Sequence, residues 1–64
     1  MNYISQNIRH LRKLRKLTQE EFSKELNITK SRIGSYEERR SEPSIEPLIE
    51  LSNFFKLPVD ILIK

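Results

Sequence analysis

The segment from Thr18 to Glu37, TQEEFSKELNITKSRIGSYE, contains two short helical patterns separated by about three residues. Thr18 followed three residues later by Glu21 is a capping-box pattern, which begins a helix. Asn27 stands where a residue in the left-handed conformation would close that helix, and asparagine tolerates this conformation. Thr29 then caps the second helix. So tight a connection forces the two helices to cross at a steep angle.

The second of these helices, expected over 30–37, has little apolar surface to bury. Apart from Ile33, Tyr36 and Glu37 its side chains are short or basic, and Gly34 costs the helix about 1 kcal/mol relative to alanine. At 100° per residue Ile33 faces the core, while Ser31 and Ser35 lie on the opposite side. A short, polar, basic outer face lets a helix backbone approach closely, so this helix is predicted to lie in a DNA major groove.

The rest of the chain adds three helical patterns and no strand pattern. Ser44 caps one of them, and Pro58 opens another. The expected fold class is all-α: a compact bundle of five short helices forming a single domain over residues 1–64. The inward positions expected in these helices are Ile4, Ile8, Leu11 and Leu14 (or Arg15) in 3–16, Ile45, Leu48, Leu51 and Phe55 after Ser44, and Val59, Leu62 and Ile63 after Pro58.

Composition excludes several classes of protein. The 64 residues include no cysteine and one histidine, His10, so neither a disulfide framework nor a common zinc site is expected. No Ser-His-acid or Cys-His pattern is evident, and no enzyme activity, metal or cofactor is expected. No apolar run approaches the roughly 20 residues of a membrane span, and the start lacks a signal-peptide pattern.

The net charge of +3 is unevenly distributed. Residues 1–17 carry five basic residues and no acidic one, and a second basic group surrounds residues 30–40, while the last third is acidic. Two separate basic clusters indicate a polyanionic partner. On charge alone, a solvated surface explains the pattern equally well.

The segment LTQEEFSKELNITKSRIGSYEERRSEPS resembles the phage-repressor-like (Cro/XRE-type) helix-turn-helix family, and the resemblance extends over about residues 8–62. It implies a five-helix, lambda-repressor-like fold with the helix-turn-helix at about 18–37. It also implies sequence-specific binding of double-stranded DNA by a transcriptional regulator. The most specific matches are Leu17-Thr18-Gln19, Tyr36-Glu37, Pro43-Ser44 and the ending 57–62.

Roles for individual residues follow from the helical wheel together with this resemblance. Base reading is expected from the outer face of the third helix, phosphate binding from the residues around it. The resemblance alone implies the phosphate role of Gln19, and it suggests a partly buried ion pair between Arg12 and Glu37. The full set is Lys30, Ser31 and Ser35 for bases, and Gln19, Arg32, Arg39 and Arg40 for phosphates.

Two positions depart from the family pattern. Arg39 occupies the place of the usual glycine after the third helix, and Lys16 that of the usual glycine before Leu17. Either Glu38 or Arg39 is therefore expected to adopt a positive φ at some strain.

The favoured interpretation is a cytoplasmic bacterial or phage transcriptional regulator that binds a palindromic operator as a homodimer. Repression is favoured over activation. Ile49, Phe54 and Ile61 are apolar positions without an evident place in the core, and form the expected dimer patch. One alternative is a protein-interaction module, such as the DNA-binding half of an antitoxin. RNA binding is a second alternative, disfavoured because no aromatic residues interleave the basic ones. Whether the chain is a complete protein or part of a longer one stays open.

Overall fold

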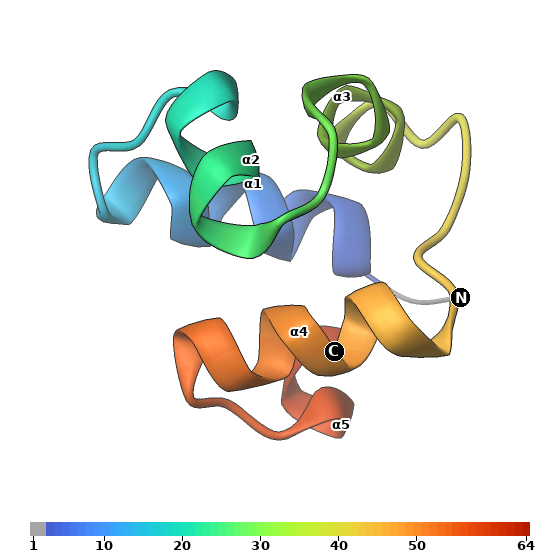
Figure 1. Cartoon of the computed structure of the whole chain (residues 1–64). Helices are drawn as coiled ribbons and strands as arrows, with labels where there is room; N and C mark the ends of the chain where they lie inside the picture. The colour runs from blue at the N-terminus through green and yellow to red at the C-terminus, as the bar shows by residue number, and fades with distance from the viewer. Residues whose placement is uncertain (1–2) are drawn as a thin grey trace.

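The computed structural model describes residues 3–64, which form five α-helices and no strand (Figure 1). The all-α, five-helix prediction is therefore confirmed for the described part of the chain. The bounds of the helices are α1 Ile4–Leu14, α2 Gln19–Leu26, α3 Lys30–Glu37, α4 Ile45–Phe55 and α5 Val59–Leu62.

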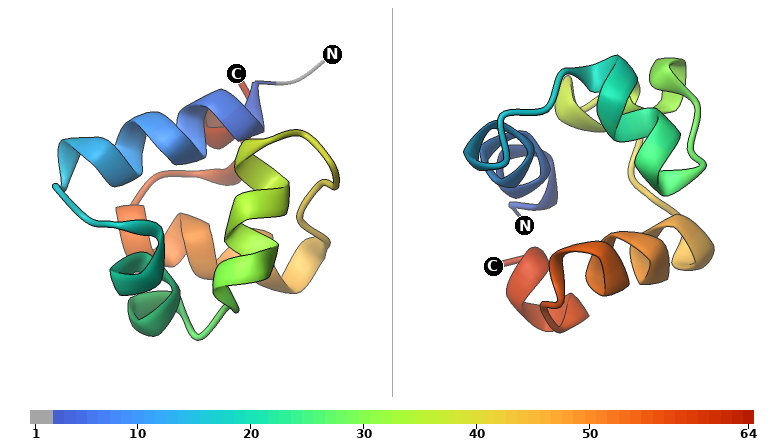
Figure 2. Two further views of the ribbon diagram at one scale, coloured as in Figure 1. Left: turned by 90° about the horizontal axis from the view of Figure 1, so that it is seen from above. Right: turned by 60° about the vertical axis from the view of Figure 1, so that its left-hand side comes forward.

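The helices are arranged in three groups around a small core. Figure 1 shows α2 and α3 together on one side of the molecule and α4 with α5 on the other, and Figure 2 shows α1 running along both groups. The helices of the α2–α3 pair cross steeply, as the short connection between them requires. This arrangement leaves the outer side of α3 facing away from α4 and α5.

Each helix contributes one fully buried side chain to the core. Removing such a side chain from water stabilises the fold by about 1.5–3 kcal/mol relative to leaving it exposed. Because every helix depends on the same small core, none is expected to fold alone. The five side chains are Ile8, Phe22, Ile33, Leu51 and Leu62.

Four helix corners are made by residues other than glycine in the left-handed region. Their φ angles are 58° at Lys16, 59° at Asn27, 63° at Arg39 and 57° at Lys56. The expectation of a positive φ at Glu38 or Arg39 is thus confirmed for Arg39. An L-residue pays roughly 1–2 kcal/mol for this conformation, and asparagine tolerates it best. The fold therefore carries strain at three corners where the chain has lysine or arginine.

Two of the expected inward positions are wrong. The side chain of Leu14 is 64% exposed, because the buried side of α1 follows Ile4, Ile8 and Arg12 at intervals of four residues. Arg15, the alternative to Leu14, is exposed as well. Ile45 is 65% exposed.

Ile45 stands at the first position of α4, outside the buried side of that helix. Pro47, Leu51 and Phe55 form this buried side, again at intervals of four residues. Leu14 and Ile45 each lie about a third of a turn around the helix from its buried side. The rotation of the helix, and not the apolar character of the side chain, therefore determines which residue is buried.

The short helix α5 is held in place by α1. The side-chain amide of Asn7 donates to the carbonyl of Leu62 at 2.6 Å, and the backbone N–H of Tyr3 donates to the carbonyl of Ile63 at 2.9 Å. A four-residue helix needs such external partners, because isolated helices of this length are unstable. Within residues 3–64 no helix has the length and apolar character to cross a membrane.

Candidate nucleic-acid interface

The crossing of α2 and α3 is fixed by side chains at their first residues. At the start of α2, Thr18 Oγ1 accepts from the backbone N–H of Glu21 at 3.1 Å, and Glu21 Oε1 accepts from the N–H of Thr18 at 2.9 Å. At the start of α3, Thr29 Oγ1 accepts from the N–H of Arg32 at 3.2 Å. These caps satisfy N–H groups that have no partner inside the helix and set where each helix begins.

The two sides of α3 differ as the wheel predicted. Ile33 and Tyr36 are buried against the rest of the protein. Lys30 and Ser31 are exposed and Ser35 is partly exposed, so the three side chains expected to face bases reach the solvent. This side of the helix offers short polar groups and one cation to whatever approaches it.

An ion pair attaches the inner side of α3 to α1. The guanidinium of Arg12 donates through Nε to Glu37 Oε2 at 2.7 Å and through Nη2 to Glu37 Oε1 at 3.0 Å. Its Nη1 donates to the carbonyl of Leu17 at 2.8 Å. The Glu37 side chain is only 3% exposed and that of Arg12 10%, so the structure places this expected pair in the interior. Bidentate geometry of this kind fixes orientation as well as charge.

Gln19 joins the same network, which the sequence did not reveal. Its Nε2 donates to Glu37 Oε1 at 3.2 Å, so Glu37 receives N–H donors from both α1 and α2. No spacing rule links two residues 18 positions apart, and the contact exists only because α2 and α3 cross at this point. The side chain of Gln19 is thereby held beside α3.

The three arginines expected to bind phosphates occupy different places. Arg32 lines a hollow of about 210 Å³ between the α2–α3 turn and the start of α4. Arg39 lies exposed in the loop after α3. Arg40 turns back toward α3, where its Nη2 lies 3.2 Å from Glu38 Oε1 and 3.9 Å from the position a Cβ on Gly34 would occupy.

Two of the five basic residues among the first 17 are held against the protein. Arg12 is buried in its ion pair, and the guanidinium of Arg15 lies over the rings of Phe54 and Phe55, 4.9 and 5.4 Å from their centroids. Such cation–π contacts hold the cation against the protein. Arg9, Lys13 and Lys16 stay exposed on and just after α1, so positive charge is available there as well as around α3.

Phe54 differs from its expected place outside the core. It is partly buried, with its ring centroid 5.7 Å from that of Phe22 and 5.1 Å from that of Phe55. Phe54 thus belongs to an aromatic cluster between α2 and α4, although it was expected in the dimer patch. Ile49 and Ile61, the other two members, are exposed.

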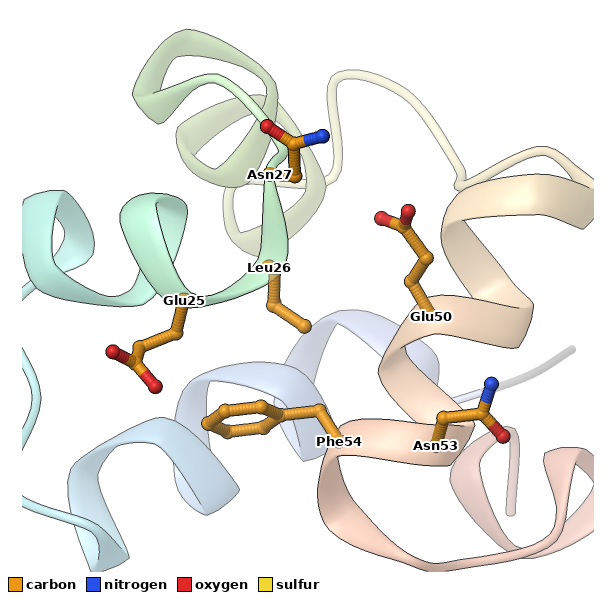
Figure 3. Close-up of a pocket in the computed structure, with 6 residues that line it drawn as sticks. All are labelled: Glu25, Leu26, Asn27, Glu50, Asn53 and Phe54. Carbon is orange, nitrogen blue, oxygen red and sulfur yellow. The ribbon is translucent and has the colours of Figure 1, made fainter.

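The surface between α2 and α4 has the opposite charge to that around α3. A groove of about 380 Å³ lies there. Figure 3 shows Phe54 extending from α4 below Leu26, with Glu25 and Glu50 at the edges of the groove. Two carboxylates and no cation line it; Asn27 and Asn53 complete the lining. A polyanion is repelled from this face, so the face around α3 is better suited to nucleic acid than this one.

No metal site comes together in the part of the chain that the structure describes. Among residues 3–64 no three His, Asp or Glu side chains are grouped so that they could hold an ion. His10 lines a mainly apolar hollow of about 300 Å³ between α1 and α5, beside Leu57 and Ile61.

Comparison with known proteins agrees with this geometry. The model of a family described as helix-turn-helix matches residues 8–62. The chain is 34% identical over 58 residues to the uncharacterized HTH-type transcriptional regulator YobD of Bacillus subtilis, covering 91% of this chain and 52% of that protein. It is 37% identical over 60 residues to the uncharacterized HTH-type transcriptional regulator YqaE of the same organism, covering 94% of this chain and 52% of that protein.

A solved structure has the same fold. The crystal structure of a transcriptional regulator from Listeria innocua superposes with a TM-score of 0.90 at 27% identity, covering 98% of this chain and 59% of that one. The chain thus spans about half the length of the curated relatives it matches. With a family model that matches residues 8–62, the chain belongs to the Cro/XRE-type helix-turn-helix family.

Proposed function

We propose that the chain binds double-stranded DNA in a sequence-specific manner as a transcriptional regulator, with α3 in the major groove. The observation that carries this proposal is the outer side of α3, where Lys30, Ser31 and Ser35 reach the solvent beside the start of α2. Lysine and serine are donors and acceptors suited to base edges. Membership of a family that contains HTH-type transcriptional regulators supports the same conclusion.

Phosphate contacts are proposed on both sides of this helix. At one side the first backbone N–H groups of α2, with the second N–H of the Gln19 amide, suit an anion at a helix N-terminus. At the other side Arg32, within α3, and Arg39, in the loop after it, are exposed. Such contacts fix the register of the protein on the duplex, and base contacts then specify the sequence.

Repression from a palindromic operator is the proposed mode of action, with two copies of the chain on half-sites about 34 Å apart. Ile49 and Ile61 are the exposed apolar side chains proposed to form the contact between copies. An operator as partner implies a cytoplasmic location. Sedimentation tests the assembly: Ile61→Asp should shift a wild-type dimer toward monomer, and a wild-type monomer at high concentration would rule out the dimer for this chain.

Selection of bound sites from random duplex DNA tests the proposed function directly. A two-fold-symmetric motif is expected, and its affinity should fall with salt at a logarithmic slope of about −0.9 for each phosphate neutralised. Lys30→Ala and Ser35→Ala should change which bases are preferred, whereas Arg39→Ala should weaken all sequences alike. Recovery of no preferred site would contradict the proposal.

A protein-interaction module is the competing function, favoured by the exposure of Ile45, Ile49 and Ile61 on α4 and α5. In that case the main partner is a protein, and binding survives high salt because buried apolar area is insensitive to ionic screening. The salt dependence of binding therefore separates the two functions.

A further inference from the structure

The chain after α3 reverses direction, so that Arg40 lies alongside the helix instead of beyond its end. Its backbone N–H donates to the carbonyl of Ser35 at 2.9 Å, and the N–H of Ser41 approaches the same carbonyl at 3.4 Å. The left-handed Arg39, at φ 63°, makes this reversal possible. The side chain of Arg40 therefore starts next to the last turn of α3.

The Arg40 guanidinium then lies over the one position of α3 that has no side chain. Its Nη2 is 3.9 Å from the point where a Cβ on Gly34 would be, and Gln19 Oε1 is 3.8 Å from that point. Together these two side chains cover Gly34, which is buried. The charge of Arg40 thus sits on α3 itself, at its junction with the start of α2.

This place adjoins the side chains proposed to read bases. Around the helix Gly34 lies 60° from Ser31 and 40° from Lys30, at 100° per residue. Ser35 is the next residue along the chain. Arg39, by contrast, lies in the loop beyond the end of the helix. Two neighbouring arginines of equal charge therefore start from different places relative to α3.

The groups around the guanidinium favour a base over a phosphate. Glu37 accepts from the Nε2 of Gln19, so the amide must turn its Oε1 the other way, toward Gly34. The carboxylate of Glu38 is 3.2 Å from Arg40 Nη2. The carboxylate disfavours a phosphate at this spot and occupies one end of the guanidinium fork. Its remaining N–H donors stay free for a pair of acceptors.

We propose that Arg40 reads a guanine in the major groove, through O6 and N7, and does not bind a phosphate. The proposal rests on the proposed DNA binding and adds a specificity-determining residue to it. Bidentate arginine–guanine contact is the geometry that the guanidinium fork fits best. Lysine at the same place lacks this planar fork.

Selection from random duplex DNA with the wild-type chain, Arg40→Ala, Arg40→Lys and Arg39→Ala tests this role. The wild-type site should contain a guanine that Arg40→Ala no longer selects, with the other positions unchanged. On the wild-type site Arg40→Ala should bind about 5- to 150-fold more weakly, which is the range for one bidentate base contact. On a site with that base pair replaced, wild type and Arg40→Ala should bind alike. Arg40→Lys should recover less than the full preference for guanine.

Arg39→Ala is the matched control, since it removes the same charge one residue away. It should weaken every site by the same factor and reduce the salt slope by about 0.9. If Arg40→Ala behaves in this way too, Arg40 binds a phosphate and the inference is wrong. If the wild-type chain selects no site at all, the proposed function fails first, so the two failures are distinguishable.

Discussion

Glu37 brings a negative charge into the protein, and its partners decide whether that charge stabilises the fold. Arg12 and Gln19 together supply three N–H donors to its two oxygens. Replacement by glutamine keeps the size of the side chain but leaves the guanidinium of Arg12 buried without a counter-charge. Glu37→Gln should therefore lower the free energy of unfolding by about 3–5 kcal/mol, the usual cost of breaking a buried pair.

Thermal unfolding followed by circular dichroism measures this loss. Glu38→Gln is the matched control, because Glu38 is the next residue, and its side chain is 61% exposed where that of Glu37 is 3% exposed. Exposed pairs contribute about 0–1 kcal/mol, so the control should melt close to the wild type. An unchanged melting temperature for Glu37→Gln would show that the buried pair does not hold α1 to α3.

The left-handed corners offer a second test on single residues. Lys56→Gly and Arg39→Gly remove an unfavourable φ, worth roughly 1–2 kcal/mol, and add the backbone freedom of glycine to the unfolded chain, which costs about 0.5–1 kcal/mol. Each variant should gain about 0.5–1 kcal/mol in urea unfolding. Only Arg39→Gly should also weaken DNA binding. Lys24→Gly, inside α2, should instead lose about 1 kcal/mol, and a loss of stability in Lys56→Gly would contradict the strain argument.

At the scale of the helices, the N-caps differ in what their hydroxyls do. Thr18 and Thr29 accept backbone N–H bonds, whereas Ser44 makes no side-chain cap bond at the start of α4. Thr18→Ala should therefore destabilise the domain by about 1 kcal/mol. Ser44→Ala should change it far less, although both residues hold the same position in their helices. Equal losses in urea unfolding would mean that the hydroxyls act through something other than capping.

The variant Gly34→Ala tests whether α3 needs a glycine at this position. A methyl group at this position would lie 3.8 Å from Gln19 Oε1 and 3.9 Å from Arg40 Nη2, which are ordinary contact distances. Alanine also favours the helix over glycine by about 1 kcal/mol. Gly34→Ala should therefore raise the midpoint of urea unfolding and leave the selected DNA site unchanged. A changed site would show that the glycine is needed for the approach of DNA, as its sequence context suggested.

For the whole molecule, the aromatic cluster between α2 and α4 holds the α2–α3 pair to the α4–α5 pair. Phe54 touches Phe22, Phe55 and the guanidinium of Arg15, so it connects α2 and α4 with the residue that ends α1. Phe54→Ala should lower stability by about 2–4 kcal/mol, somewhat below the 3–5 of a fully buried phenylalanine. Ile49→Ala, on an exposed residue of the same helix, should cost less than about 0.5 kcal/mol in the same urea titration. Similar losses would place Phe54 outside the core.

Much of the fold could be predicted because its signals are local. Helix starts at Thr18 and Thr29, and the left-handed Asn27, follow from residue types a few positions apart, and the structure has them where expected. The outward direction of Ser31 follows from the helical period alone. Leu14 and Ile45 were assigned wrongly because an apolar residue near a helix end fits the period loosely, and only packing fixes the phase of the helix.

The sequence by itself determined the order of the helices, the steep α2–α3 crossing and the short polar side chains on the outer side of α3. These features depend on residues that are only a few positions apart in the sequence. Only the tertiary structure decided which charges remain available. It buried Arg12 against Glu37, held Arg15 on two phenylalanine rings and laid Arg40 over Gly34. Each of these contacts joins separate helices or depends on the chain reversal after α3. Their electrostatic energies depend on distances in space, which the spacing of residues along the sequence does not specify.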